Sequence, residues 1–170
     1  MATNGRSNLI IRGALQAAQR ANSAIIIEIA RSEGGASSYC AVNYWNMARQ
    51  VDALCNELGI TVPVAIHADH YGIKKEQDIA AAKIEIPTVF EAGLTSIAID
   101  ASHMPDDKNL LANIELNPFI PKWAGLETEV GERLQRRTLA PNKAHMWRKD
   151  LVAGADEVIA VEILHVQQPV

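Results

Sequence analysis

Helical and extended patterns of apolar residues alternate along this chain. An apolar stripe with helical spacing covers residues 7–22, where Ser7 is placed to cap the helix, and a β-branched run follows at residues 24–30. The alternation recurs at intervals of roughly 30 residues, which is typical of βα units in a parallel sheet. Further helices are predicted at residues 44–58, 74–83, 87–92 and 106–115, and further strands at residues 2–4, 62–70, 95–100 and 125–131.

Polar residues, glycines and prolines predict where these elements end. Residues 31–35 are polar and contain glycine, so they are expected to form a loop. Gly59 is expected to end the helix before it, and Tyr71 with Gly72 is expected to break the strand that precedes them. A separate helical segment is expected to begin at Pro87, because proline suits the first turn of a helix better than its interior.

The strand at residues 62–70 carries the densest set of candidate functional groups. Apolar residues occupy both of its faces, as in a parallel strand that is covered on both sides. It ends in His67, Asp69 and His70, and burying such groups is costly unless something uses them. A carboxylate beside a histidine at a strand end can supply an acid/base group and a metal ligand. A lone histidine there is more often a hydrogen-bonded structural residue, so that alternative stays open for each histidine.

The usual nucleotide-binding fingerprints do not occur in the sequence. No GxGxxG follows the first strand, and no GxxxxGK[ST] is found anywhere. We therefore expect a (β/α)8 TIM barrel rather than a doubly wound sheet. A full barrel needs at least ~200 residues, so this barrel is expected to be incomplete, with about its first half to two-thirds present.

Composition narrows the function classes. The chain has 170 residues, of which 48% are hydrophobic and 21% charged, and this suits one globular domain with a core. The net charge of −4, the lack of a basic stripe and an aromatic content of 5% argue against a nucleic-acid partner. Cys40 and Cys55 lack CxxC spacing, and no signal peptide or apolar run of ~20 residues occurs, so we expect a cytoplasmic protein with reduced thiols and no membrane span.

Three blocks of residues, in this order and spacing, carry a family resemblance. They are His67-Ala-Asp-His70, Ser102-His-Met-Pro-Asp106 and Leu126-Glu-Thr-Glu-Val-Gly131. Together with Asn4, residues 12–19 and residues 34–37, they resemble the metal-dependent class II fructose-bisphosphate aldolases over about residues 2–132.

This resemblance implies a role for each matching residue. Asp69 would be the catalytic acid/base, and His70 would be a ligand of Zn²⁺ or of another divalent cation. Asp106 and Glu129 would lie near the metal. The substrate would be a phosphorylated sugar, and the substrate contacts would include Asn4, Ser32 and Gly34. Independently of the resemblance, a partial barrel leaves sheet edges unpaired, so the protein is expected to be a homo-oligomer.

Several of the implied roles have plainer alternatives. Asp106 follows Pro105 and can equally cap a helix. Asp100 ends a strand and can be structural. Glu127 and Glu129 share one face of a short strand, and one of them is expected to be only solvated.

The family pattern stops after Glu132, which divides the chain into residues 1–132 and a divergent tail of residues 133–170. We find neither the glycine-rich active-site loop nor the phosphate-binding loop that the family carries. Residues 154–161 faintly resemble the family's sixth strand, whose end bears a zinc histidine, and this makes His165 a further candidate ligand.

Two functions from different classes remain open. The first is an aldolase-type lyase that cleaves or forms a ketose bisphosphate, either fructose 1,6-bisphosphate or the neighbouring tagatose bisphosphate. The second is a non-catalytic, incomplete barrel or assembly subunit. The pair Asp69 and His70 favours the first function, and the missing phosphate loop favours the second.

Overall fold

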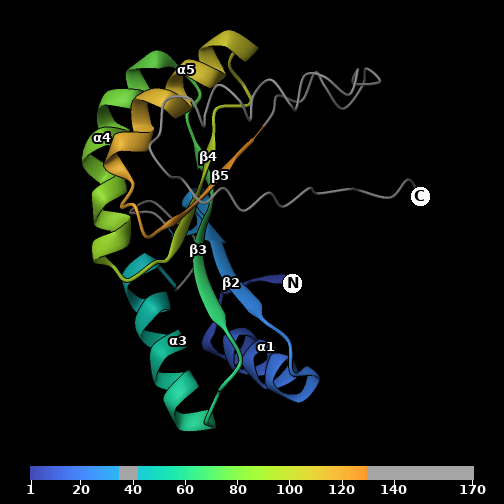
Figure 1. Cartoon of the computed structure of the whole chain (residues 1–170). Helices are drawn as coiled ribbons and strands as arrows, with labels where there is room; N and C mark the ends of the chain where they lie inside the picture. The colour runs from blue at the N-terminus through green and yellow to red at the C-terminus, as the bar shows by residue number, and fades with distance from the viewer. Residues whose placement is uncertain (35–41, 130–170) are drawn as a thin grey trace, which may run out of the picture.

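The computed structural model describes residues 1–34 and 42–129, which form a parallel sheet flanked by helices (Figure 1). The divergent tail predicted at residues 133–170 lies outside the described residues. The strands are β1 (Ala2–Asn4), β2 (Ile25–Ala30), β3 (Val64–Gly72), β4 (Ser96–Asp100) and β5 (Gly125–Thr128). The helices are α1 (Asn8–Ala21), α2 (Arg31–Gly34), α3 (Tyr44–Leu58), α4 (Glu76–Glu91), α5 (Asp106–Leu116) and the 3₁₀ helix η1 (Asn117–Phe119).

The order of strands in the sheet follows the order of strands in the chain. All neighbouring pairs from β1 to β5 are parallel, and helices lie in the connections between them. A doubly wound sheet reverses its strand order part-way, whereas a barrel adds each strand beside the previous one. The described residues therefore form a five-stranded part of a (β/α)8 barrel, as predicted.

The predicted helix ends are confirmed where capping groups are present. The Ser7 side chain accepts a hydrogen bond from the backbone N–H of Ile10 at the start of α1. Asn43 and Asn46 form a capping box at the start of α3. Gly59 ends α3 with a φ of 61°, a left-handed conformation that glycine adopts without a Cβ clash.

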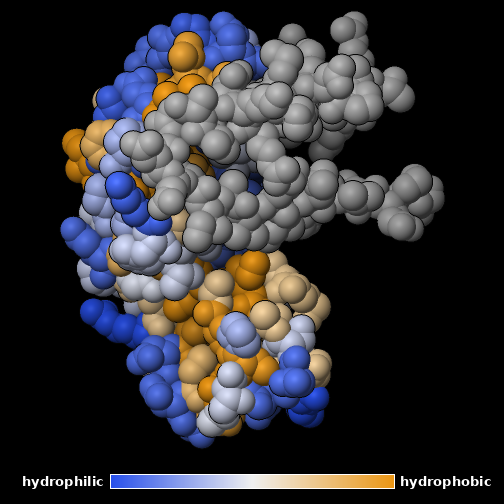
Figure 2. Space-filling view, in the orientation of Figure 1, coloured by the Kyte–Doolittle hydropathy of each residue, from blue (hydrophilic) through white to orange (hydrophobic). Residues whose placement is uncertain are grey.

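The two faces of the sheet differ in chemistry. Ile27, Ile97 and Ile99 belong to the core cluster shared with the helices, and each is fully buried. The pairing register aligns a polar row on the opposite face, namely Asn4, Glu28, His67 and Ser96. In a closed barrel that face lines the interior, so this row of polar side chains lies on the inner side of the sheet. In Figure 2, apolar residues gather on the lower half of the face in view, over the region where β2 and β3 begin.

Sequence predictions about local structure were wrong in three places: at residues 31–34, at residues 71–72 and within residues 74–92. Residues 31–34 form the short helix α2 rather than a loop. Tyr71 and Gly72 do not break β3, because they pair with Ile99 and Asp100 of β4.

The helical segments predicted at residues 74–83 and 87–92 form one helix, α4, with Pro87 inside it. An interior proline costs about 3 kcal/mol, but Ile86, Val89 and Phe90 on either side of it are buried and stabilise the continuous helix. None of the helices in the described residues is long and apolar enough to span a membrane.

Candidate active site

A bulge in β3 creates the site. Ala68 pairs with Ile97 and Tyr71 pairs with Ile99, so three steps along β3 correspond to two steps along β4. One extra residue is therefore accommodated in β3, and His70 takes a φ of 45°, which is uncommon for a residue with a Cβ. Such bulges change the direction of side chains, and they are common next to active sites.

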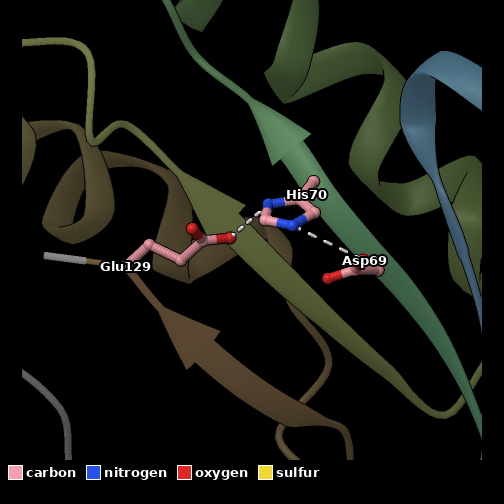
Figure 3. Close-up of side chains that lie close together, drawn as sticks. All are labelled: Asp69, His70 and Glu129. Carbon is pink, nitrogen blue, oxygen red and sulfur yellow. Dashed lines mark ion pairs between the residues drawn. The ribbon is translucent and has the colours of Figure 1, made fainter. Parts of the chain in front are cut away.

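The bulge brings two consecutive side chains together. Successive residues of a regular strand point to opposite faces, so Asp69 and His70 would normally be separated by the sheet. Here Asp69 Oδ2 lies 3.7 Å from His70 Nε2 (Figure 3). Tyr71 instead reaches α4, where its hydroxyl donates a hydrogen bond to Glu85.

Neighbouring strands add two carboxylates on the other side of the His70 ring. Glu129, directly after β5, places Oε1 2.9 Å from His70 Nδ1 (Figure 3). Asp100, the last residue of β4, places Oδ2 3.5 Å from the same nitrogen. The imidazole therefore lies between Asp69 on one side and Glu129 with Asp100 on the other. The ring remains accessible, since the His70 side chain is 58% exposed.

The crowded carboxylates change the protonation of the site. Burial, reinforced by repulsion from Asp100, raises the pKa of Glu129 to about 7. Burial alone would lower the pKa of His70, but the negative charges of Asp69, Glu129 and Asp100 outweigh it and raise that pKa. The same cluster of charges therefore raises the proton affinity of both His70 and Glu129.

The sequence of residues 1–138 matches the family described as fructose-bisphosphate aldolase class-II. The chain belongs to this family. It is 30% identical over 118 residues to a fructose-bisphosphate aldolase of Staphylococcus aureus, a match that covers 69% of this chain and 37% of that protein. It is 34% identical over 122 residues to 6-phospho-5-dehydro-2-deoxy-D-gluconate aldolase of Bacillus subtilis, which covers 69% of this chain and 36% of that protein.

A solved structure supports the fold of this class II aldolase family member. The YdjI aldolase of Escherichia coli superposes with a TM-score of 0.64 at 22% identity, over 88% of this chain and 50% of that one. The chain spans little more than a third of the length of the curated relatives it matches.

The donor set of this class II aldolase chain fits a divalent cation. Ligand atoms of Asp69, His70 and Glu129 all lie within 4.8 Å of one another. One imidazole with carboxylate oxygens is a donor set that Zn²⁺ accepts, and carboxylates also suit harder divalent cations. His70, Glu129 and Asp100 could hold a metal on the Nδ1 side of the ring, and Asp69 lies on the Nε2 side.

The first histidine of the His67-Ala-Asp-His70 block has a different environment. His67 is 5% exposed, its Nδ1 lies 2.8 Å from Ser96 Oγ, and its Nε2 lies 3.5 Å from Glu127 Oε2. Burial lowers the pKa of His67, so a neutral ring is favoured. His67 is therefore a packed, hydrogen-bonded residue of the barrel interior, and Glu127 contacts it rather than being only solvated.

The predicted substrate contacts lie at the carboxyl ends of β1 and β2. Asn4 donates a hydrogen bond of 2.7 Å to Glu33 Oε2, and Glu33 is buried and also forms an ion pair with Arg6. Ser32 is exposed, whereas a Cβ on Gly34 would lie 3.1 Å from Ile29 Cγ2. Close packing against Ile29 explains why a residue without a side chain is present at position 34. The substrate contacts of Asn4, Ser32 and Gly34 stay predictions.

Two predicted metal ligands are not among the converging residues. Asp106 is the first residue of α5, where Pro105 is the N-cap, and its role at the metal stays a prediction. His165 lies outside the described residues. Asp100 was expected only as a structural residue at a strand end. The carboxyl ends of neighbouring parallel strands meet at one edge, so its place at the end of β4, beside β3, was the available signal.

Proposed function

We propose that this chain provides the acid/base and metal-binding part of an aldolase that cleaves a phosphorylated ketose. The observation that supports this proposal is the convergence of Asp69, His70 and Glu129 at the ends of two strands, in a chain of the class II aldolase family. The proposed reaction converts fructose 1,6-bisphosphate into glycerone phosphate and glyceraldehyde 3-phosphate. Tagatose bisphosphate is the neighbouring substrate to compare.

In the proposed mechanism Asp69 moves the proton. A retro-aldol cleavage removes a proton from a substrate hydroxyl, breaks the adjacent carbon–carbon bond and leaves the electron pair on the ketone half as an enediolate. The half-buried Asp69 carboxylate lies at the strand end with one oxygen toward His70, where it can accept that proton and return it. A divalent cation held by His70 and Glu129 would supply Lewis-acid stabilisation of the developing negative charge.

Further residues complete the proposal. Asn4, Ser32 and Gly34 would contact the sugar phosphate, and Asp106 and His165 would join the metal site in the assembled protein. We also propose a cytoplasmic location, supported by two cysteines without CxxC spacing, which cell fractionation checks.

The test of the proposed function combines an activity assay with metal removal. Triose phosphate released from fructose 1,6-bisphosphate is measured before chelation, after chelation and after addition of Zn²⁺. Activity is expected to vanish with the chelator and to return with the metal. Cleavage at an unchanged rate after complete removal of metal would overturn the metal-dependent mechanism.

The affinity for zinc is expected to be modest and to depend on pH. One imidazole is fewer than the three or four ligands of a tight zinc site, so binding should be weak and partial unless His165 joins. The raised pKa values of His70 and Glu129 make protons compete with the metal, so affinity should rise from about pH 6 to about pH 8. Tight one-to-one binding in calorimetry that survives His165→Ala would contradict this ligand set.

The alternative function as an assembly subunit is favoured by the edges of the sheet. Within the described residues, β1 and β5 each pair on one side only. Unpaired edges promote association with other chains, and for the same reason we propose a homo-oligomer. Sedimentation velocity at low concentration tests both proposals, and a monomer with a sharply cooperative unfolding transition would count against them.

A further inference from the structure

Three side chains from three elements enclose the end of the β3 bulge. The Arg31 guanidinium of α2 lies over the Tyr71 ring, 4.5 Å from its centroid. Arg31 Nη2 lies 2.6 Å from Glu85 Oε2 of α4, and the Tyr71 hydroxyl donates to the same oxygen at 2.7 Å. Arg31 Nη1 also donates to the backbone carbonyl of Gly72 at 3.3 Å. We call Arg31, Tyr71 and Glu85 the Tyr71 clamp.

The clamp follows directly after the strained residue of the site. A left-handed φ is unfavourable for a residue with a Cβ, and such a conformation persists only when its surroundings fix it. His70 has this φ, and the next two residues are the ones that Arg31 holds, one through its ring and one through its carbonyl. The Tyr71 ring itself is buried, at 1% exposure.

Loss of the bulge would exchange the faces of these side chains. In a regular strand, if Asp69 stayed on its face, His70 would turn toward the helices and Tyr71 would turn inward. The Tyr71 hydroxyl would then leave Glu85, and His70 would leave Glu129. The same strand register therefore determines two sets of contacts. These are the contact of Tyr71 with Glu85 on the outer side of the sheet and the contact of His70 with Glu129 on the inner side.

We propose that the Tyr71 clamp fixes the β3 bulge and thereby orients His70 toward the metal site, which makes Arg31 a positioning residue. The part that concerns the metal rests on the proposed function, whereas the part that concerns the bulge does not. Arginine is suited to this task because a planar guanidinium can stack on a ring and bind a carboxylate and a carbonyl together. Lysine keeps the charge but cannot make this combination of contacts.

The test compares two arginines of the same chain. Arg31→Lys is the test variant, and Arg12→Lys is the matched control, because Arg12 forms a two-pronged ion pair with Glu57 at 2.9 and 2.8 Å that joins α1 to α3. Amide chemical shifts and hydrogen exchange of residues 68–73 are measured in the full, metal-free chain, and Zn²⁺ affinity is measured by calorimetry. Tyr71→Phe serves as a milder variant that keeps the ring but loses the hydroxyl.

Arg31→Lys is expected to shift the amide signals of His70, Tyr71 and Gly72 and to weaken Zn²⁺ binding about 10–100-fold, as changes behind metal ligands do. Tyr71→Phe is expected to give a smaller effect in the same direction, and Arg12→Lys is expected to leave both measurements as in the wild type. The proposal is overturned if Arg31→Lys leaves the bulge signals unchanged, or if Arg12→Lys changes them equally. If the wild type binds no Zn²⁺, the proposed metal function fails, and the metal-free amide signals alone decide the role of the clamp.

Discussion

His70→Ala is expected to abolish zinc binding and aldol cleavage together. His70 is the one imidazole among the three converging residues, and its two nitrogens face Asp69 and Glu129. Zinc ligation by the remaining carboxylates would lack the nitrogen donor, so affinity should fall by more than about 100-fold, beyond the effect of changing a supporting residue. Calorimetry should therefore show the loss of Zn²⁺ binding, and the cleavage assay should show a parallel loss of activity.

The exposed His103 provides the matched control for this variant. It lies outside the converging residues, so His103→Ala should keep the zinc affinity of the wild type. Retention of full zinc affinity and cleavage by His70→Ala would remove His70 from the site and would leave the family resemblance of its block without a chemical meaning.

Asp69→Ala should separate proton transfer from metal binding. General acid/base catalysis typically contributes ~10²–10⁴-fold to a rate, so cleavage should fall by about that factor. Zinc affinity should change little, because Glu129 and Asp100 approach His70 from the opposite side of its ring. The measurements are kcat in the cleavage assay and the zinc content of the same preparation, in an assembled barrel that carries this segment.

Asp107→Asn is the control for removing one negative charge. Asp107 is exposed in the first turn of α5, so both measurements should stay at the wild-type level. If Asp69→Ala loses metal as fully as His70→Ala does, Asp69 is a ligand rather than the acid/base. Full activity after Asp69→Ala would remove it from the mechanism.

Local sequence signals were sufficient for most of the fold. Ser7 and Gly59 bound helices because a side-chain oxygen and a left-handed glycine satisfy backbone groups at helix ends, whatever the tertiary contacts are. The alternation of helices and strands correctly predicted parallel pairing. Pro87 was misleading because the buried residues around it, which no local rule registers, stabilise the helix through it.

The bulge could not have been predicted from the sequence. Tyr71 and Gly72 have the composition of a strand break, and only their pairing with β4 makes them part of β3. The sequence therefore supplied Asp69 and His70 as candidates but gave no reason for both side chains to lie on one face. The end of a neighbouring strand was the signal for Asp100, but its distance to His70 depends on the register between strands rather than on any local pattern.

The sequential strand order also bears on how the chain folds during synthesis. Each strand from β2 to β5 pairs with the strand translated just before it, so none of these five described strands has to wait for a distant partner. Closing such short connections costs less chain entropy than pairing strands from opposite ends of a protein. As the ribosome adds residues, the sheet can therefore grow from β1 toward β5, and each newly translated apolar strand meets an open edge beside which it can be buried.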